Sequence, residues 1–562
     1  MKKNWPSIIA VILLLGQLAF QLYMAKTDAQ TTDEGVHLSA GFTYLTKRDF
    51  RFNPEHPPFL KELATLPLLF IHPNIPEDQK YWDKAADFYY DSWRENRAFG
   101  DEMLYALGNN ADLLLFWGRL APVLITFLLG LAVFLISKRF FGSLGGLIST
   151  VFFVLDSLIN GHGHLITTDI AVSLGILLSI YFLYRLLETR RMLFGILFGV
   201  SAGLALASKH TAVMLIPISL VLIIVYQIWF SEGKRARSLI LPIIAAIFLS
   251  FILIWASYGF TYRLPPKINS VQQIFKSNIP LYKTESFNEQ KQGFTGTKDK
   301  MTTIVLNAAR RVLFPQDYYK GLVSLLIHAG SGHSSFLLGE TSITGWWYYF
   351  PVVFAAKTPI PELIGLVAAV WLIIRRKNKP AIFFLLAALL YLLLAMVSKA
   401  DLGLRHLMPI YPVIFISLGV LANLKGLWKL LPIALVAFSI FEFITAYPYH
   451  LSYFNAAVGG TNNGYRIAAD SNLDWGQDLK RIKAYLDESN LGNNVFVEYG
   501  WNSELALDYY GIKRKPLSEL TPDSSGYVVI GSSALQSDAY KWLRDGFEPI
   551  ARITPSVFLF QI

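Results

Sequence analysis

The sequence predicts an α-helical polytopic membrane protein with about eleven spanning helices, interfacial helices in the first outer loop, and a small C-terminal extracytoplasmic α/β domain. Of its 562 residues, 53% are apolar and only 16% are charged, and the mean hydropathy is +0.41. A soluble domain usually carries about 25% charged residues. Apolar runs of about 20 residues recur along the chain, and this is the length that crosses a bilayer as a helix.

The first apolar run follows Lys2 and Lys3. A cleaved signal peptide is the alternative for this run, but no clean small-x-small cleavage site follows it, so we expect a first spanning helix. The eleven expected spans are Trp5–Met24, Asp112–Ser137, Phe141–Ile159, Thr167–Leu187, Leu193–Ser208, Thr211–Phe230, Leu239–Tyr258, Trp347–Ile374, Ala381–Val397, Leu404–Ala422 and Leu427–Ala446.

Basic residues gather in every second loop, which indicates the cytoplasmic side and places the N-terminus inside. An odd number of spans then places the C-terminal domain outside. The chain has no cysteine, so its exported parts hold together without disulfides, and this suits a bacterial plasma membrane, with an archaeal one as the alternative. The basic loop residues are Lys2, Lys3, Lys138, Arg139, Arg185, Arg190, Arg191, Lys234, Arg235, Arg237, Arg375, Arg376, Lys377, Lys379, Lys425 and Lys429.

The chain divides into a membrane module at 1–446 and a C-terminal domain at 447–562. The membrane module has large outer loops at 25–111 and 259–346. In the first loop, His37–Leu45 and Phe59–Leu69 are amphipathic and are expected to lie in the membrane interface. In the tail, Val495–Tyr499, Tyr527–Ile530 and Val557–Gln561 have strand patterns, and Leu479–Leu486 has helical spacing.

Two groups of polar residues in the first outer loop have chemistry suited to catalysis. The acidic pair Asp33-Glu34 follows the first span, where a carboxylate can take a proton from an acceptor hydroxyl. A helix N-cap or a solvated charge is the alternative. Further on, Asn53-Pro54-Glu55-His56-Pro57-Pro58 holds a carboxylate and an imidazole on a backbone stiffened by proline. A helix-entry turn also explains these prolines.

This order of motifs resembles the type C glycosyltransferases, and more narrowly the superfamily of protein O-mannosyltransferases and lipid A aminoarabinose transferases, in its bacterial phospholipid-carrier-dependent branch. The resemblance covers about Met1–Tyr447. It implies that Asp33 or Glu34 is the catalytic base and that Glu55, with His56 beside it, belongs to a second site element. It also implies a polyprenyl-phosphate sugar donor. Some members bind a divalent metal, which leaves a metal on Asp33, Glu55 and His333 undecided.

Ionisable residues also interrupt the apolar runs on the outer side. The segment from Gly161 to Asp169 includes His164 and resembles a loop of the same superfamily that ends in Thr-Asp; capping is the alternative for Asp169. Lys209 stands between two spans, where it can bind the carrier phosphate or extend to the interface. The resemblance implies a phosphate contact for this lysine.

Arg405 and His406 open the tenth expected span on the same outer side. With Lys209 they would form a cationic pocket for the donor phosphate, if the helices are adjacent. A structural pair between Arg405 and Asp401 is the alternative.

Weaker candidates lie in the second outer loop and in the tail. His333 and Glu340 precede an aromatic run from Gly345 to Pro351 that is typical of a membrane interface. In the tail, the polar segment from Asp470 to Asp478 is either an acceptor-binding element or a turn in which Asp474 caps the next helix.

The function that follows is transfer of a sugar from a polyprenyl-phosphate donor to a protein, glycolipid or polymer, by an inverting single displacement. The net charge of +10 does not indicate nucleic acid, because the basic residues lie between apolar runs. No glycine-rich phosphate loop or Asp-x-Asp motif for a soluble nucleotide sugar is present. A transporter or flippase, and a non-catalytic subunit of envelope assembly, are the other classes this sequence allows.

Overall fold

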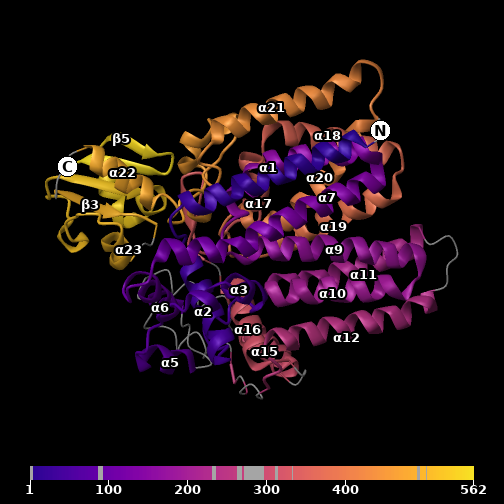
Figure 1. Cartoon of the computed structure of the whole chain (residues 1–562), viewed down its shortest axis with the longest axis horizontal. Helices are drawn as coiled ribbons and strands as arrows, with labels where there is room; N and C mark the ends of the chain where they lie inside the picture. The colour runs from indigo at the N-terminus through magenta and orange to yellow at the C-terminus, as the bar shows by residue number, and fades with distance from the viewer. Residues whose placement is uncertain are drawn as a thin grey trace.

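Long, nearly parallel helices form the bulk of the molecule, and the N-terminus and the C-terminal sheet lie at opposite ends of them (Figure 1). The structure is a computed structural model. It describes residues 4–86, 93–230, 236–262, 267, 269–270, 296–310, 314–331, 333–489, 491, 494–500 and 503–562. The predicted basic residues Lys2, Lys3, Lys234 and Arg235 lie outside the described residues, as does most of the stretch 263–295 in the second outer loop.

Each of the eleven expected spans is helical in the described structure. Seven helices are long and apolar enough to cross a membrane, and one bent pair raises this to eight. The chain is therefore a multi-pass membrane protein, and the number eleven stays a prediction. The helices are α1 Trp5–Thr27, α7 Ala111–Leu155, α8 Ser157–His162, α9 Thr168–Thr189, α10 Met192–Ser208, η1 His210–Met214, α11 Leu215–Trp229, η2 Ala236–Leu239, α12 Ile240–Ser257, α17 Tyr349–Lys357, α18 Ile360–Arg375, α19 Lys379–Ala395, η4 Leu404–Ile410, α20 Tyr411–Leu418, η5 Gly419–Asn423, η6 Gly426–Lys429 and α21 Leu430–Ala446.

The helices are interrupted at two notable places, of which one agrees with a boundary between expected spans and the other does not. Within α7, Gly142 has φ 81° and ψ 175°, which divides the apolar run close to the predicted boundary. A residue with a side chain would be strained at this φ. The expectation of one continuous span at Trp347–Ile374 is wrong, because α17 and α18 are bent by 112°. Pro359 and Pro361 lie at this bend and cannot donate the backbone hydrogen bonds of a continuing helix.

The described part of the first outer loop contains five helices, α2 to α6. They lie toward the end of the molecule away from the N-terminus (Figure 1). Every residue of α2 from Glu34 to Tyr44 is buried, so this helix has no exposed face over that stretch, and its position relative to the membrane interface stays a prediction. Gly100 of α6 allows this burial: a Cβ added there would lie 2.6 Å from the backbone of Gly35. The helices are α2 Glu34–Lys47, α3 Phe59–Thr65, α4 Leu68–Ile71, α5 Gln79–Ala86 and α6 Trp93–Tyr105.

The second outer region contains two helices and a short hairpin in its described part. The hairpin pairs Ser335 with Ser342 and Leu337 with Glu340. Leu337 also bridges to Ala468, which places the hairpin beside the C-terminal segment. The elements are α15 Gly296–Ala309, α16 Gln316–Ser331, β1 Ser335–Leu337 and β2 Glu340–Ser342.

The C-terminal segment contains a four-stranded sheet of order β3-β4-β6-β5 with helices around it. β3 and β4 are parallel, and the other pairs are antiparallel. The three strands expected from sequence correspond to β3, β4 and β6, whereas β5 was not predicted. The elements are η7 Ala456–Val458, η8 Thr461–Arg466, η9 Asp470–Asn472, α22 Leu479–Ser489, β3 Val495–Glu498, α23 Glu504–Tyr509, η10 Leu517–Glu519, β4 Tyr527–Gly531, α24 Ser532–Leu535, η11 Asp538–Tyr540, α25 Lys541–Gly546, β5 Pro549–Thr554 and β6 Val557–Gln561.

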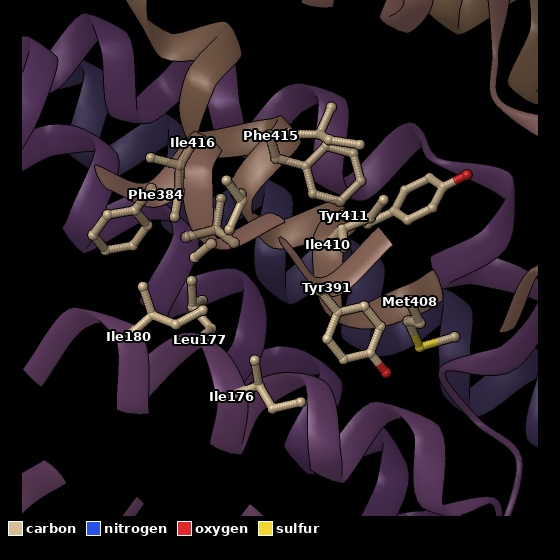
Figure 2. Packing of buried hydrophobic residues seen from close by; sticks show 14 of the residues in the cluster. Ile176, Leu177, Ile180, Phe384, Tyr391, Met408, Ile410, Tyr411, Phe415 and Ile416 are labelled. Atoms are coloured by element: carbon tan, nitrogen blue, oxygen red, sulfur yellow. The ribbon is translucent and has the colours of Figure 1, made fainter. Parts of the chain in front are cut away.

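The α20 segment runs through the centre of the bundle. Phe415 and Ile416 of α20 pack among residues that include Ile180 of α9 and Phe384 of α19 (Figure 2). The span from Leu404 to Asn423 is 94% buried, far more than the outer helices. Close packing of this kind fixes side-chain positions. The residues at the start of η4 and of α9 are therefore held on rigid elements.

Candidate active site

Four ionisable residues that lie far apart in the sequence meet at one end of the bundle. Lys209 Nζ lies 2.5 Å from Asp169 Oδ1. Arg405 Nη1 lies 3.3 Å from Asp169 Oδ2 and 3.5 Å from Asp33 Oδ2. The structure thus brings together four of the sequence-predicted site residues, two of them cationic and two acidic.

The chain places each of these groups where a helix begins or ends. Asp33 directly precedes α2, and Asp169 lies in the first turn of α9. Lys209 stands between α10 and η1 in an extended conformation. Arg405 lies in the first turn of η4, after Gly403 with φ 150°. Three of the four side chains are almost fully buried: the exposed fraction is 4% for Lys209, 2% for Asp169 and 9% for Arg405.

Asp169 does not act as a helix cap. The residue at the N-cap position of α9 is Thr167, and its side chain makes no capping hydrogen bond. The Asp169 carboxylate instead pairs with both cations. The alternative pair of Arg405 with Asp401 is also absent, because Asp401 Oδ2 accepts a hydrogen bond from the backbone N–H of Trp346 at 2.7 Å.

The C-terminal segment holds Arg405 from the other side. Arg405 Nε donates to Ser471 Oγ at 3.1 Å, and its guanidinium lies 4.2 Å from the centre of the Trp475 ring. Such a cation–π contact contributes about 0.5–2 kcal/mol. A Cβ at Gly403 would lie 2.5 Å from Ser471 Oγ, so glycine permits this close approach. Nη2 of Arg405 has no hydrogen-bond partner among the described residues, which leaves it available for an anion.

Asp33 is the acidic member of this cluster that water can reach. Its side chain is 18% exposed, compared with 2% for Asp169. Burial raises the pKa of Asp33 to about 6; Arg405 opposes this shift, whereas the charges of Glu55 and Asp169 add to it. A carboxylate that titrates near neutral pH is suited to take a proton.

Glu34 has a different environment from its neighbour. Its two oxygens pair with Arg119, at 2.8 Å to Nε and 2.6 Å to Nη2. They also accept hydrogen bonds from the backbone N–H groups of Thr31 and Ile166, at 2.9 and 3.0 Å. Both oxygens of Glu34 are therefore occupied and the residue is fully buried, which favours Asp33 over Glu34 as the base.

Glu55 and His56 lie in the turn before α3, close to the cluster. Glu55 influences Asp33 electrostatically, and His56 is within electrostatic reach of Lys209. The His56 ring packs edge-on against His37, with centroids 5.3 Å apart. Burial lowers the pKa of His56 well below its ordinary value, so the imidazole is neutral at neutral pH. These two residues therefore border the cluster.

The remaining predicted residues are arranged less directly. His164 is fully buried, and its Nε2 pairs with Asp28 Oδ2 at 3.0 Å, so it holds the end of α1. His406 follows Arg405 and acts electrostatically on Asp169. His333 lies two residues before β1, and Glu340 begins β2 with an exposed side chain. The structure does not bring Glu340 into the buried cluster.

The sequence left a metal on Asp33, Glu55 and His333 undecided. Within the described ranges, no group of three or more His, Asp or Glu side chains is arranged to hold a metal ion. A divalent cation prefers several oxygen ligands or a compact nitrogen and oxygen set.

The polar segment of the tail has a different role from the one favoured by its sequence. Asp474 does not cap α22, which begins at Leu479. Its carboxylate accepts hydrogen bonds from the backbone N–H of Ser533, at 3.1 Å from Oδ2, and from the Ser533 hydroxyl. Burial raises the pKa of Asp474 to about 7, although these hydrogen bonds oppose the shift. Asp474 thus ties the Trp475 segment to the C-terminal sheet.

Sequence reasoning missed two functional neighbours. Arg119 lies within an expected span. That position was the one signal in the sequence, because ionisable residues inside spans are seldom incidental. Its Nη1 also donates to the carbonyls of Ala25 and Asp28, both at 2.8 Å, so it fixes the loop that carries Asp33. Trp475 gave no local signal for its contact with Arg405, because the two residues are distant in sequence.

The site and the helical bundle define the class of protein as a polytopic membrane protein with an ionisable site at one end. The family described as dolichyl-phosphate-mannose-protein mannosyltransferase matches residues 108–258, which include Asp169 and Lys209. The resemblance to the protein O-mannosyltransferase superfamily, stated above from the motifs, is confirmed over this segment. Comparison with curated protein sequences finds no significant match.

Two solved structures that align with almost all of this chain are distant from it in sequence. ArnT from Cupriavidus metallidurans bound to undecaprenyl phosphate is 12% identical, with 98% of this chain and 97% of that chain covered and a TM-score of 0.47. The apo oligosaccharyltransferase from Archaeoglobus fulgidus is 12% identical, with 98% and 73% covered and a TM-score of 0.48. Since each TM-score is below 0.5, these structures do not assign a function to the chain.

Proposed function

We propose that this protein is a membrane glycosyltransferase that moves a sugar from a polyprenyl-phosphate donor to an acceptor on the extracytoplasmic side. One observation carries the proposal: Lys209, Arg405 and Asp33 meet at one end of a helical bundle. This set supplies cations for a phosphate and a carboxylate for a proton. The matched family, whose description names a dolichyl-phosphate sugar, supports the same class of donor.

The cations of the cluster suit the leaving phosphate. Asp169 holds both Lys209 and Arg405, which fixes their positions without using all their donors. Lys209 Nζ makes one hydrogen bond among the described residues, and Arg405 Nη2 makes none. Positioned cations stabilise negative charge as it develops on a leaving group. The donor phosphate would therefore lie against Lys209 and Arg405.

Asp33 would act on the acceptor. In a single displacement, the acceptor oxygen forms a bond to the anomeric carbon while the bond from that carbon to the phosphate oxygen breaks. Polyprenyl phosphate leaves with the electron pair, and Asp33 takes the acceptor proton. The anomeric configuration is inverted. A protein, glycolipid or polymer would serve as acceptor, and the Trp475 segment would complete the site from the C-terminal side.

Donor binding tests the role of the cations without knowledge of the acceptor. Lys209→Ala and Arg405→Ala are each expected to weaken binding of a polyprenyl-phosphate sugar at least tenfold, because each removes a charge-assisted contact. Native mass spectrometry of the detergent-purified protein measures this. Lys541→Ala is the matched control, because that lysine is 66% exposed on α25 and should leave binding unchanged. Equal binding by all four proteins would overturn the assignment.

The proton-accepting role of Asp33 predicts a pH dependence. The base must be ionised, and the pKa of Asp33 is about 6. We expect kcat/KM to be constant above about pH 7 and to fall tenfold per unit below about pH 6, because kcat/KM reports the free enzyme. Measuring transfer rates from pH 5 to 8.5 tests this. A rate that stays constant from pH 7.5 to 5, in protein that remains folded, would contradict it.

A further inference from the structure

A second site lies apart from the ionisable cluster, at the outer end of α21. A cavity of about 590 Å³ is formed there by α21, the η7–η8 region and β5. This end of α21 lies beside the C-terminal segment (Figure 1). A volume of this size is typical of sites for small organic ligands. Six aromatic residues line it: Phe438, Phe441, Tyr447, Tyr449, Tyr453 and Phe454.

Three carboxyl groups gather at and behind one wall of the cavity. Glu442, in the last turns of α21, lines it directly. Glu362 in the first turn of α18 acts electrostatically on both Glu442 and Asp156, which follows α7. The exposed fraction is 5% for Glu442 and 0% for Glu362 and Asp156. The proposed transfer reaction uses none of them.

Part of this arrangement has a structural explanation. Glu442 Oε2 accepts from the backbone N–H of Ile360 at 3.1 Å, and Asp156 Oδ1 accepts from that of Ile159 at 2.7 Å. These bonds satisfy backbone N–H groups in the first turns of α18 and α8. They use one oxygen of each carboxyl group. Glu362 lies behind the wall within hydrogen-bonding reach of the Asp156 carboxyl group, so these two groups satisfy each other and leave Glu442 as the carboxyl group at the cavity.

Of the three carboxyl groups, Glu442 lines the cavity, and Tyr453 lines it as well. The Tyr453 hydroxyl lies within hydrogen-bonding reach of the Glu442 carboxyl group. Tyr453 is 97% buried, because its exposed fraction is 3%, and it lines the same cavity as Glu442. No described Lys, Arg or His forms an ion pair with any of the three carboxyl groups. Buried carboxyl groups are costly unless a cation or hydrogen-bond donor meets them.

The geometry favours an organic cation over a metal ion. The three carboxyl groups are not arranged as a metal-binding group in the described structure. The aromatic lining contributes ring faces, which attract ammonium groups. Arg552 of β5 also lines the cavity, with its guanidinium beside the ring of Phe558 and a hydrogen bond to the carbonyl of Asn462. A ligand with both charges fits this lining: its ammonium group would lie near Glu442 and its phosphate near Arg552.

The position of the cavity beside α21 favours a membrane lipid as the source of the organic cation. The outward face of α21 beside the cavity is apolar and exposed: Phe441 is 61% and Ile444 is 65% exposed. Such a face lies against acyl chains in a membrane. We propose that this cavity binds the headgroup of a phospholipid that carries a primary ammonium and a phosphate, with its acyl chains along α21.

Lipid binding in native mass spectrometry tests the site. Short-chain phosphatidylethanolamine is expected to bind the wild type at least tenfold more tightly than phosphatidylglycerol of the same chain length. Glu442→Gln should reduce this preference at least tenfold, since it deletes the charge and keeps the size. Tyr453→Phe should weaken it severalfold. Glu488→Gln, at an exposed position on α22, is the matched control and should keep the preference.

The alternatives give distinct outcomes. Equal binding of the two lipids, or a preference unchanged in both Glu442→Gln and Glu362→Gln, would overturn the site. Soluble phosphoethanolamine that binds as tightly as the lipid would overturn the lipid source. Thermal unfolding in phosphatidylglycerol reports whether each variant is folded, and the Tyr453→Phe variant keeps the test open if a carboxyl variant is not.

Discussion

Asp33→Asn is expected to lower the turnover of sugar transfer by about 10²–10⁴-fold, the usual contribution of a general base. The amide has nearly the same size and cannot take a proton. Its neighbours, above all Arg405 at 3.5 Å, stay in place. The measurement is transfer of labelled sugar from a polyprenyl-phosphate donor in membranes that supply the natural acceptor.

Donor binding separates loss of chemistry from loss of the site. We expect Asp33→Asn to keep donor binding within about threefold of the wild type, because the phosphate contacts are assigned to Lys209 and Arg405. Asp545→Asn, whose side chain is 55% exposed, controls for the loss of one carboxylate. Wild-type turnover in a folded Asp33→Asn protein would rule out Asp33 as the base.

Arg119→Met is expected to destabilise the protein by about 3–5 kcal/mol, the range for a buried pair that loses one partner. The change leaves the Glu34 carboxylate buried at 0% exposure without its cation. It also removes the hydrogen bonds to the carbonyls of Ala25, Asp28 and Ala29. Thermal unfolding of the purified protein, followed by helical circular dichroism, measures the loss.

Two further variants show whether the buried pair is the cause. The double variant Glu34→Gln with Arg119→Met should be more stable than Arg119→Met alone, because no uncompensated charge remains. Arg139→Met removes an exposed pair with Glu188, 3.7 Å apart, and should cost no more than about 1 kcal/mol. Equal unfolding temperatures for Arg119→Met and Arg139→Met would refute a supporting role for the Glu34 pair.

The helices and the candidate residues follow from local patterns in the sequence. An apolar run of about 20 residues can satisfy its backbone in a membrane only as a helix, so the spans were predictable. Asp169, Lys209 and Arg405 were conspicuous because each is an ionisable residue at the edge of such a run. The bend between α17 and α18 was missed, because hydropathy is averaged over both sides of Pro359.

The C-terminal strands show the same limit. β3, β4 and β6 have enough β-branched and aromatic residues to be recognised. β5 includes Pro549 and two charged or polar residues, and it forms an edge of the sheet, where side chains need not be apolar. Its pairing with β6 depends on the partner strand, which no local pattern encodes.

The sequence by itself determined that this is a multi-pass membrane protein and which ionisable residues lie at the edges of its apolar runs. Only the tertiary structure decided which partner each of these side chains contacts. Asp33 and Glu34 are neighbours, yet a helix turns about 100° per residue, so one carboxylate meets Arg405 and the other meets Arg119. The contacts among Lys209, Asp169, Arg405 and Trp475 join residues up to 236 positions apart in the sequence. Such contacts depend on how helices pack, and packing is a property of the whole chain.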